Sequence, residues 1–270
     1  MSAKNSNAST IITALVLCLV CSVLVSAVAV GLKSKQQDNA RQDLNKNILI
    51  AAGKFNPQTD STSVIAERFA SFDVRYVNLE TGAYATDEEI AAAGLGDVNS
   101  YDVAKAARTP ELSTSLENDI AGIGGKPKFS KVYLAKGADG NVEEIVLPIH
   151  GAGLWGQIYG LLTLDKDLNT IKGVNFYQHK ETPGLGSRIT DEPWRALWVD
   201  KQLYNEDGSM KMAVTKAGTA KEGQVDGISG ATLTIRGVNN LLQFWMGENG
   251  YKPFLDHLKQ AGNADSGQGA

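Results

Sequence analysis

The strongest constraint on this chain is an uncharged apolar run that extends from Ile11 to Leu32. Its length matches the roughly 20 residues that a helix needs to cross the hydrocarbon core of a bilayer. A cleaved signal peptide is the alternative, because Ala27-Val28-Ala29 fits a small-x-small cleavage site. However, the run is longer than a typical signal core, and only Lys4 charges the residues before it. We therefore expect a short N-terminal segment, residues 1–10, followed by an uncleaved transmembrane helix over 11–32.

Charge alone does not fix which side of the membrane holds the rest of the chain. Lys33, Lys35, Arg41 and Lys46 follow the apolar run, whereas only Lys4 precedes it. The positive-inside rule read literally keeps the C-terminal part in the cytoplasm. Long domains are translocated largely regardless of charge, so the rule is weak here.

Both cysteines of the chain, Cys18 and Cys21, lie inside the expected span, one helical turn apart. They are either small packing residues, which the sequence favours, or half of a metal site that a partner helix would complete. Beyond the span there is no cysteine, and therefore neither a disulfide nor a thiolate-bound iron–sulfur cluster. The mild net charge of -4 argues against a nucleic-acid partner.

After the span we expect a single soluble α+β domain with an antiparallel sheet. Residues 33–130 are expected to form a membrane-proximal region of helices and mixed structure, residues 131–260 the core, and residues 261–270 a disordered tail. The segments expected in the first part are a polar helix over 33–53, a short helix over 64–72, a strand over 74–84 with a turn at Gly82, a helix over 87–108 broken at Gly94-Leu95-Gly96, and a flexible connector over 121–125.

Turn residues and periodicity predict two hairpins and two helices in the core. The hairpins pair 129–135 with 142–149 around Asp139-Gly140, and 157–164 with 171–177. One helix is expected to start at Pro193, with Trp194, Leu197 and Trp198 on one face. The second is expected over 231–246, with Val238, Leu241, Leu242 and Trp245 on one face and Gly247 and Gly250 at its end.

The sharpest local feature is Asp226-Gly227-Ile228-Ser229-Gly230-Ala231-Thr232, a glycine-rich loop that enters the second of these helices. Free N–H groups in the first turn of a helix, together with the helix dipole, favour a bound phosphate. Thr232 places a hydroxyl in that turn, where a phosphate could esterify it. Ser229 is expected to cap the helix. An N-capped loop without any ligand is the alternative from loop chemistry alone.

The pattern Asp-x-x-Ser-Gly-Ala-Thr resembles the flavinylation motif of the FMN-binding subunits in Na+-translocating NADH:quinone reductases and Rnf-type complexes. In that family the last threonine carries FMN through a phosphoester bond, which a flavin transferase installs from FAD. The resemblance therefore implies covalent FMN on Thr232. The cofactor-binding residues that it implies around Thr232 are Asp226, Gly227, Ser229, Gly230 and Ala231.

Two further segments resemble the same family. Gln178 to Gly186 is similar to its His-x-Glu-Thr-Pro-Gly-Leu-Gly loop, and Gly153-Leu154-Trp155-Gly156 to its Gly-Leu-Trp-Gly segment. Pro183-Gly184 suits a type II turn. The cofactor-binding residues implied by these segments are His179, Glu181, Thr182, Gly184, Leu185 and Trp155. The alternatives are an ordinary strand-end histidine at His179 and a core tryptophan at Trp155.

The resemblance covers the anchor, the three motifs and their order, and the chain length fits the C subunit of the quinone reductases better than the shorter G subunit of the Rnf complexes. It implies a protein that relays electrons from NADH toward ubiquinone, coupled to sodium export, together with subunits A, B, D, E and F. It places the flavin domain on the periplasmic side of a bacterial inner membrane. The Rnf G subunit, a stand-alone extracytoplasmic flavin reductase and a non-redox phosphate-binding module are the alternatives. No Walker loop or Gly-x-Gly-x-x-Gly fingerprint indicates an NADH site.

Overall fold

A computed structural model of the chain describes residues 7–137 and 139–266, with side chains up to residue 261. The chain divides into two compact units, Met1–Asn45 and Lys46–Ala270. Helix α1, Asn7–Ala51, supplies the described part of the first unit, and residues 1–6 of the expected N-terminal segment lie outside the described residues. Within the described ranges, α1 is the one helix whose length and composition would let it cross a membrane. Its apolar side chains over 11–32 are exposed, which fits the predicted anchor.

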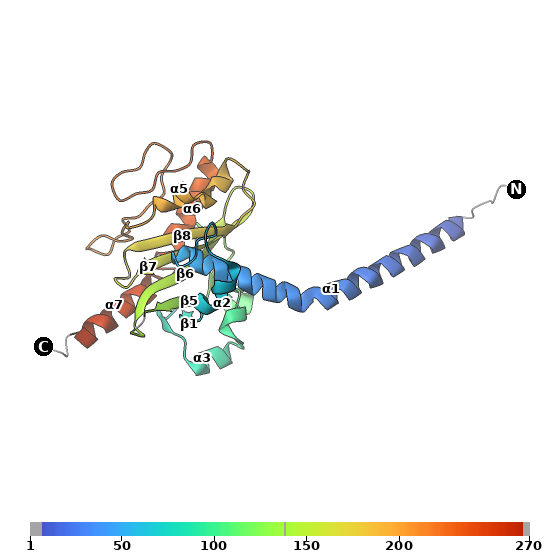
Figure 1. The fold of residues 1–270 in the computed structure, drawn as a ribbon, viewed down its shortest axis with the longest axis horizontal. Coiled ribbons are helices and arrows are strands. Elements are labelled where there is room, and N and C mark those ends of the chain that lie inside the picture. The colour runs from blue at the N-terminus through green and yellow to red at the C-terminus, as the bar shows by residue number, and fades with distance from the viewer. Residues whose placement is uncertain (1–6, 138, 267–270) are drawn as a thin grey trace. The chain divides into compact units, whose positions relative to one another are not determined.

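The second unit is built on one antiparallel sheet in the order β2-β1-β5-β6-β7-β8 (Figure 1). This confirms the α+β class and both predicted hairpins. The strands are β1 Phe72–Asn78, β2 Ala83–Tyr84, β5 Phe129–Lys136, β6 Val142–Ala152, β7 Gln157–Asp165 and β8 Ile171–Gln178, and a separate pair is formed by β3 Ser113–Thr114 and β4 Lys126–Pro127.

Short helices fill the connections. They are η1 Thr62–Val64, α2 Ile65–Phe69, α3 Asp87–Ala92, η2 Val98–Ser100, α4 Val103–Ala106, η3 Pro110–Leu112, η4 Gly186–Thr190 and α5 Glu192–Ala196. The helical region expected over 87–108 is therefore broken, as predicted at its glycines, into three short pieces. Thr86 closes the start of α3 with a capping box to Glu89.

The boundary expected at residue 130 does not separate two parts of the fold. Strand β1 pairs with β5 along its whole length, from Phe72 opposite Ala135 to Asn78 opposite Phe129. Residues before 130 thus supply an inner strand of the same sheet. Local periodicity predicted the strand, but the partner of a strand is set by tertiary packing, which periodicity does not report.

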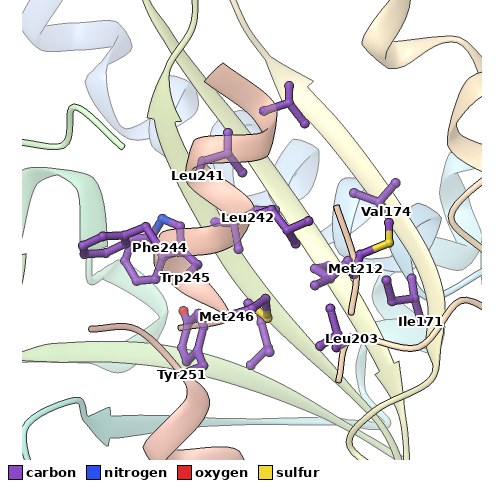
Figure 2. Close-up of a cluster of buried hydrophobic side chains, with 14 of the residues drawn as sticks. Ile171, Val174, Leu203, Met212, Leu241, Leu242, Phe244, Trp245, Met246 and Tyr251 are labelled. Atoms are coloured by element: carbon purple, nitrogen blue, oxygen red, sulfur yellow. The ribbon is translucent and has the colours of Figure 1, made fainter. Parts of the chain in front are cut away.

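Helix α6, Thr232–Trp245, covers one face of the sheet and lies against β6. Its buried side chains Leu241, Leu242 and Trp245 follow helical spacing, as predicted. Figure 2 shows them in one cluster with Val174 of β8 and with Met212 from the segment before α6.

The opposite face of the sheet is covered by the last turns of α1. Gly173 of β8 lies so close to α1 that an added Cβ would meet the Ala51 carbonyl oxygen at 2.3 Å. Asn175, on the same face by strand alternation, donates to the side-chain oxygen of Asn47 at 2.9 Å. Ile48 and Leu49 are fully buried. The end of α1 is therefore part of the domain core.

We expect a chain that lacks residues 1–35 to be soluble and folded, because residues 46–270 form a compact unit of their own. A chain that lacks residues 1–53 is the matched control. It loses Ile48 and Leu49, and truncation of a buried aliphatic side chain costs about 2–5 kcal/mol each. Gel filtration followed by thermal unfolding checks both. Aggregation of the longer chain, or equal melting temperatures, would contradict this boundary.

Two other expectations were wrong. The segment 121–125 is not a flexible connector, because Ala121 and Ile123 are buried and the Asp119 carboxylate accepts the N–H groups of Ile123 and Gly124. The predicted helix face is also wrong in part: Trp194 in α5 and Trp198 beyond it are buried, but Leu197, which follows the end of the helix at Ala196, is exposed.

The last helix, α7, extends over Lys252–Ser266. It therefore includes the first residues of the tail that was expected to be disordered from 261 onward. The helical pattern of Phe254 and Leu255, both buried, starts this helix, and nothing in the polar sequence after them breaks it. Residues 267–270 lie outside the described residues.

Candidate functional site

Helix α6 begins at the last residue of the 226–232 motif. Thr232 is its first residue and is exposed, and Ala231 at the N-cap offers no side-chain acceptor. The first backbone hydrogen bond into the helix runs from the Ile235 N–H to the Ala231 carbonyl, at 2.9 Å. The N–H groups before Ile235 have no intrahelical partner. The turn therefore offers several donors beside the Thr232 hydroxyl, an arrangement that suits a phosphate group.

The two hydroxyls near Thr232 differ in access. Thr234 lies two residues further along the helix, about 200° away around its axis, and is only 2% exposed. Ser229 is exposed but does not cap α6, so that expectation was wrong: the chain reaches the helix through Gly230, at φ +81°, and Ala231 occupies the N-cap. Only Ser229 competes with Thr232 for an incoming group from solvent.

Asp226, the first residue of the motif, holds the loop before it. Its carboxylate accepts the N–H groups of Gly218 at 2.8 Å, Thr219 at 3.1 Å and Ala220 at 3.3 Å. These bonds hold the pKa of Asp226 below its usual value of 3.8, and the bond from Gly218 has the largest effect. Its carbonyl accepts the indole N–H of Trp194 at 2.9 Å. The carboxylate thus shapes the backbone that leads into the motif.

We expect Asp226→Asn to loosen residues 216–224. The amide nitrogen that replaces Oδ2 cannot accept the N–H of Gly218, and the remaining bonds to Oδ1 lose the charge that strengthens them. Limited proteolysis of this loop at pH 7 should accelerate roughly three- to tenfold, the range for losing about one net hydrogen bond. Because the pKa is lowered on folding, the bonds contribute fully above pH 3.8 and are lost as pH falls through the lower folded value. Glu222→Gln, an exposed residue of the same loop, is the control, and an equal rate in both variants would contradict the role.

The loop after β8 has the turn that Pro183-Gly184 predicted. Gly184 has φ +74°, and the N–H of Leu185 donates to the Thr182 carbonyl at 3.1 Å. The same carbonyl accepts the N–H of Ser187. Inside the loop, Nδ1 of His179 accepts the N–H of Glu181 at 3.1 Å. His179 therefore orders the loop through one ring nitrogen, which agrees with the strand-end alternative and leaves Nε2 for another partner.

Glu181 lies beneath this loop and does not reach its surface. It is only 4% exposed, and its carboxylate accepts the N–H of Trp155 at 3.1 Å and the hydroxyl of Thr234 at 2.5 Å. Its side chain thus contacts the protein where the sequence predicted a cofactor contact. Thr234, a second hydroxyl in the first turn of α6, was not among the predicted site residues. Its helical spacing to Val238 and Leu241 placed it on the buried face.

Three large apolar side chains surround the motif on the exposed side. Trp155 is 64% exposed, Leu233 50% and Leu185 44%. The indole N–H of Trp155 donates to the Thr182 hydroxyl at 3.1 Å, which joins its loop to the turn. A Cβ on Gly230 would lie 3.1 Å from Leu185, so the turn also borders the motif. Exposed apolar side chains that cluster around a few polar groups are typical of ligand-binding surfaces, whereas single exposed apolar side chains are common anywhere on a protein.

The chemistry of the site suits a flavin nucleotide. The first turn of α6 offers a hydroxyl and N–H donors to a phosphate, and Trp155, Leu185 and Leu233 offer flat or apolar surface to a ring system. Within the described residues, no group of three or more His, Cys, Asp or Glu side chains could hold a metal ion. Cys18 and Cys21 are free and exposed on α1, so a metal site shared with a partner stays a prediction.

The domain resembles known flavin-binding proteins. A family model described as an FMN-binding domain matches residues 153–247, which contain all three motifs. The C subunit of the Na(+)-translocating NADH-quinone reductase from Pseudomonas aeruginosa is 39% identical over 96% of this chain and 99% of its own length. The corresponding protein from Neisseria meningitidis serogroup B is 40% identical over 96% of this chain and 97% of its own length.

Solved structures agree. The crystal structure of Shewanella oneidensis NqrC has a TM-score of 0.72 and 35% sequence identity, and covers 82% of this chain and 98% of that chain. The crystal structure of the corresponding reductase protein from Parabacteroides distasonis has a TM-score of 0.64 and 30% identity, and covers 83% of this chain and 96% of that chain. Both similarities extend well beyond the segment that the family model matches.

Proposed function

The chain belongs to the NqrC family, the C subunits of Na+-translocating NADH-quinone reductases, and from that premise we propose that it carries FMN as a phosphoester on Thr232. Membership makes it an electron-transfer component of an oxidoreductase complex and a flavoprotein with an FMN-binding domain. The names of these relatives also favour this assignment over the Rnf G subunit.

One observation carries the covalent link. Thr232 is an exposed hydroxyl at the first position of a helix of 14 residues, where the neighbouring N–H groups have no intrahelical partner. A phosphodiester at this position keeps one negative charge, and the helix dipole and the free donors stabilise it. No side chain competes for the donors, since α6 has no side-chain cap.

The remaining residues of the site have distinct tasks in this proposal. Trp155, Leu185 and Leu233 provide the surface for the isoalloxazine, and Thr182, Gly184 and His179 shape its edge. Asp226, Gly227, Ser229, Gly230 and Ala231 shape the loop that presents Thr232. When bound, FMN supplies reversible uptake of electrons, and the protein supplies its position and surroundings. The ester bond keeps the cofactor in place over many turnovers.

The setting of the reaction is part of the proposal. Helix α1 anchors the chain in a bacterial inner membrane, with the flavin domain on the periplasmic side. There it works with subunits A, B, D, E and F, and relays electrons from NADH toward ubiquinone, coupled to sodium export. A flavin transferase moves FMN from FAD to the Thr232 hydroxyl, breaking the pyrophosphate bond and releasing AMP. The support is family membership together with a helix fit to span a membrane.

The direct test is mass spectrometry of the intact denatured chain after co-expression with a flavin transferase. We expect one FMN-sized increment, and a yellow, ultraviolet-fluorescent band on a denaturing gel. Protein that releases all its flavin on denaturation would contradict covalent attachment and favour a reversible phosphate-binding module. A purified domain that turns over small acceptors by itself would favour a stand-alone reductase.

A further inference from the structure

The carboxylate of Glu181 is buried without a cation. Its side chain is 4% exposed, and among the ion pairs of residues 7–137 and 139–266 none involves Glu181. Buried carboxylates are costly unless they are paired or fully hydrogen-bonded. This one is held by the Trp155 N–H on Oε1 and by the Thr234 hydroxyl on Oε2. The two hydrogen bonds offset the cost of burying the carboxylate, so each of them matters for the local structure.

Each of these contacts comes from a different part of the site. Trp155 belongs to the loop between β6 and β7, Glu181 to the loop after β8, and Thr234 to the first turn of α6. Two glycines leave space for the carboxylate. A Cβ on Gly153 would lie 2.4 Å from Oε1, and a Cβ on Gly186 would lie 2.9 Å from Oε2 and 2.5 Å from the Thr234 hydroxyl oxygen.

We propose that Glu181 and Thr234 are positioning residues that hold the ring-binding surface at a fixed place relative to the attachment threonine. Thr234 is two residues from Thr232 on the same helix, and Glu181 links it to the backbone of Trp155. The attachment point and the exposed indole are therefore joined through a single carboxylate. This inference rests on the proposed attachment of FMN to Thr232, and it adds a role for two residues that do not touch solvent.

The hydrogen bond between Thr234 and Glu181 can form in one direction only. The carboxylate can only accept, so the Thr234 hydroxyl must donate to it. Thr234→Val keeps the shape of the side chain but removes the donor, and leaves Oε2 buried without a partner. Thr234→Ser restores a donor with one methyl group fewer. The two substitutions separate the hydrogen bond from the packing of the side chain.

The first measurement uses the full chain in detergent, produced without a flavin transferase. Hydrogen exchange of the peptide that contains Trp155 reports its N–H bond to Glu181. We expect exchange in Thr234→Val to accelerate roughly three- to tenfold, the range for loss of one hydrogen bond, and Thr234→Ser to restore it. Unchanged exchange in Thr234→Val overturns the link, whether or not flavin can be attached.

The second measurement uses the same variants after co-expression with a flavin transferase. Intact mass gives the attached FMN and so tests the proposed function separately. Both flavin signals are divided by the amount of attached FMN. In Thr234→Val we expect the visible circular dichroism to fall and the flavin fluorescence to rise severalfold, because the ring is less constrained. Thr234→Ser should restore both signals. A lower melting temperature with unchanged flavin signals would mean that the pair only stabilises the fold, and would overturn the positioning role.

Discussion

A chain carrying Thr232→Ala should retain no FMN after denaturation, although its fold should be unchanged. The substitution removes the one nucleophilic oxygen that the helix presents to solvent beside free N–H donors. Alanine is compatible with the first turn of a helix, so we expect a change in the free energy of unfolding within about 0.5 kcal/mol. The measurement is intact mass together with in-gel fluorescence, after co-expression with an active flavin transferase.

Neighbouring hydroxyls provide the controls for this result. Ser229→Ala removes an exposed hydroxyl from the same loop and should keep attachment, since Ser229 neither lies in α6 nor caps it. Thr232→Ser retains the oxygen and should keep part of the attachment. An FMN increment that persists in Thr232→Ala, mapped by peptide analysis to Ser229 or Thr234, would assign the site to another residue.

Features with a local cause were predictable from the sequence. Helix α6 was expected over 231–246 and observed over Thr232–Trp245, because its apolar residues repeat with the helical period and glycines follow it. The turn at Gly184 was expected from Pro183-Gly184 and has the positive φ that this dipeptide favours. In each case neighbouring residues alone determine the conformation.

Features that residue composition does not report were not predictable in the same way. Ser229 has the composition of a helix cap, but the positive φ of Gly230 moves the helix start beyond its reach. Segment 121–125 is rich in glycine, yet the residues between the glycines are buried and Asp119 holds its backbone. Composition reports how freely a segment can move in isolation, whereas packing decides how it lies in the fold.

The candidate site follows the same division. The sequence singled out the threonine, the two loops and the glycines as candidates, because each belongs to a contiguous motif. It could not show that Glu181 turns inward to Thr234, since the two are far apart in the chain and meet only when β8 and α6 pack together. A polar residue inside a binding motif was therefore predicted to contact the ligand, whereas its carboxylate accepts the Trp155 N–H and the Thr234 hydroxyl.

The largest effect on stability is expected for Trp245→Ala. Trp245 is fully buried in the cluster of Figure 2, and its indole N–H donates to the His150 carbonyl at 2.7 Å. Its ring packs against Tyr251, with centroids 5.4 Å apart. Removing a buried tryptophan costs about 3–5 kcal/mol, which in a domain of this size lowers the melting temperature by on the order of 10 °C. Thermal unfolding of the full chain in detergent measures this shift.

Trp155→Ala is the matched control, because the same side chain is removed from an exposed position. It should change the free energy of unfolding by less than about 1 kcal/mol, since it loses one exposed hydrogen bond and little buried area. Its effect should appear instead in the attached flavin, as higher fluorescence and a weaker visible circular dichroism signal. In Trp245→Ala, by contrast, the folded fraction below the melting transition should keep the flavin signals of the unmodified chain. Equal loss of stability in both variants would contradict the assignment of Trp155 to a ligand surface, because only a packed tryptophan stabilises the fold by that amount.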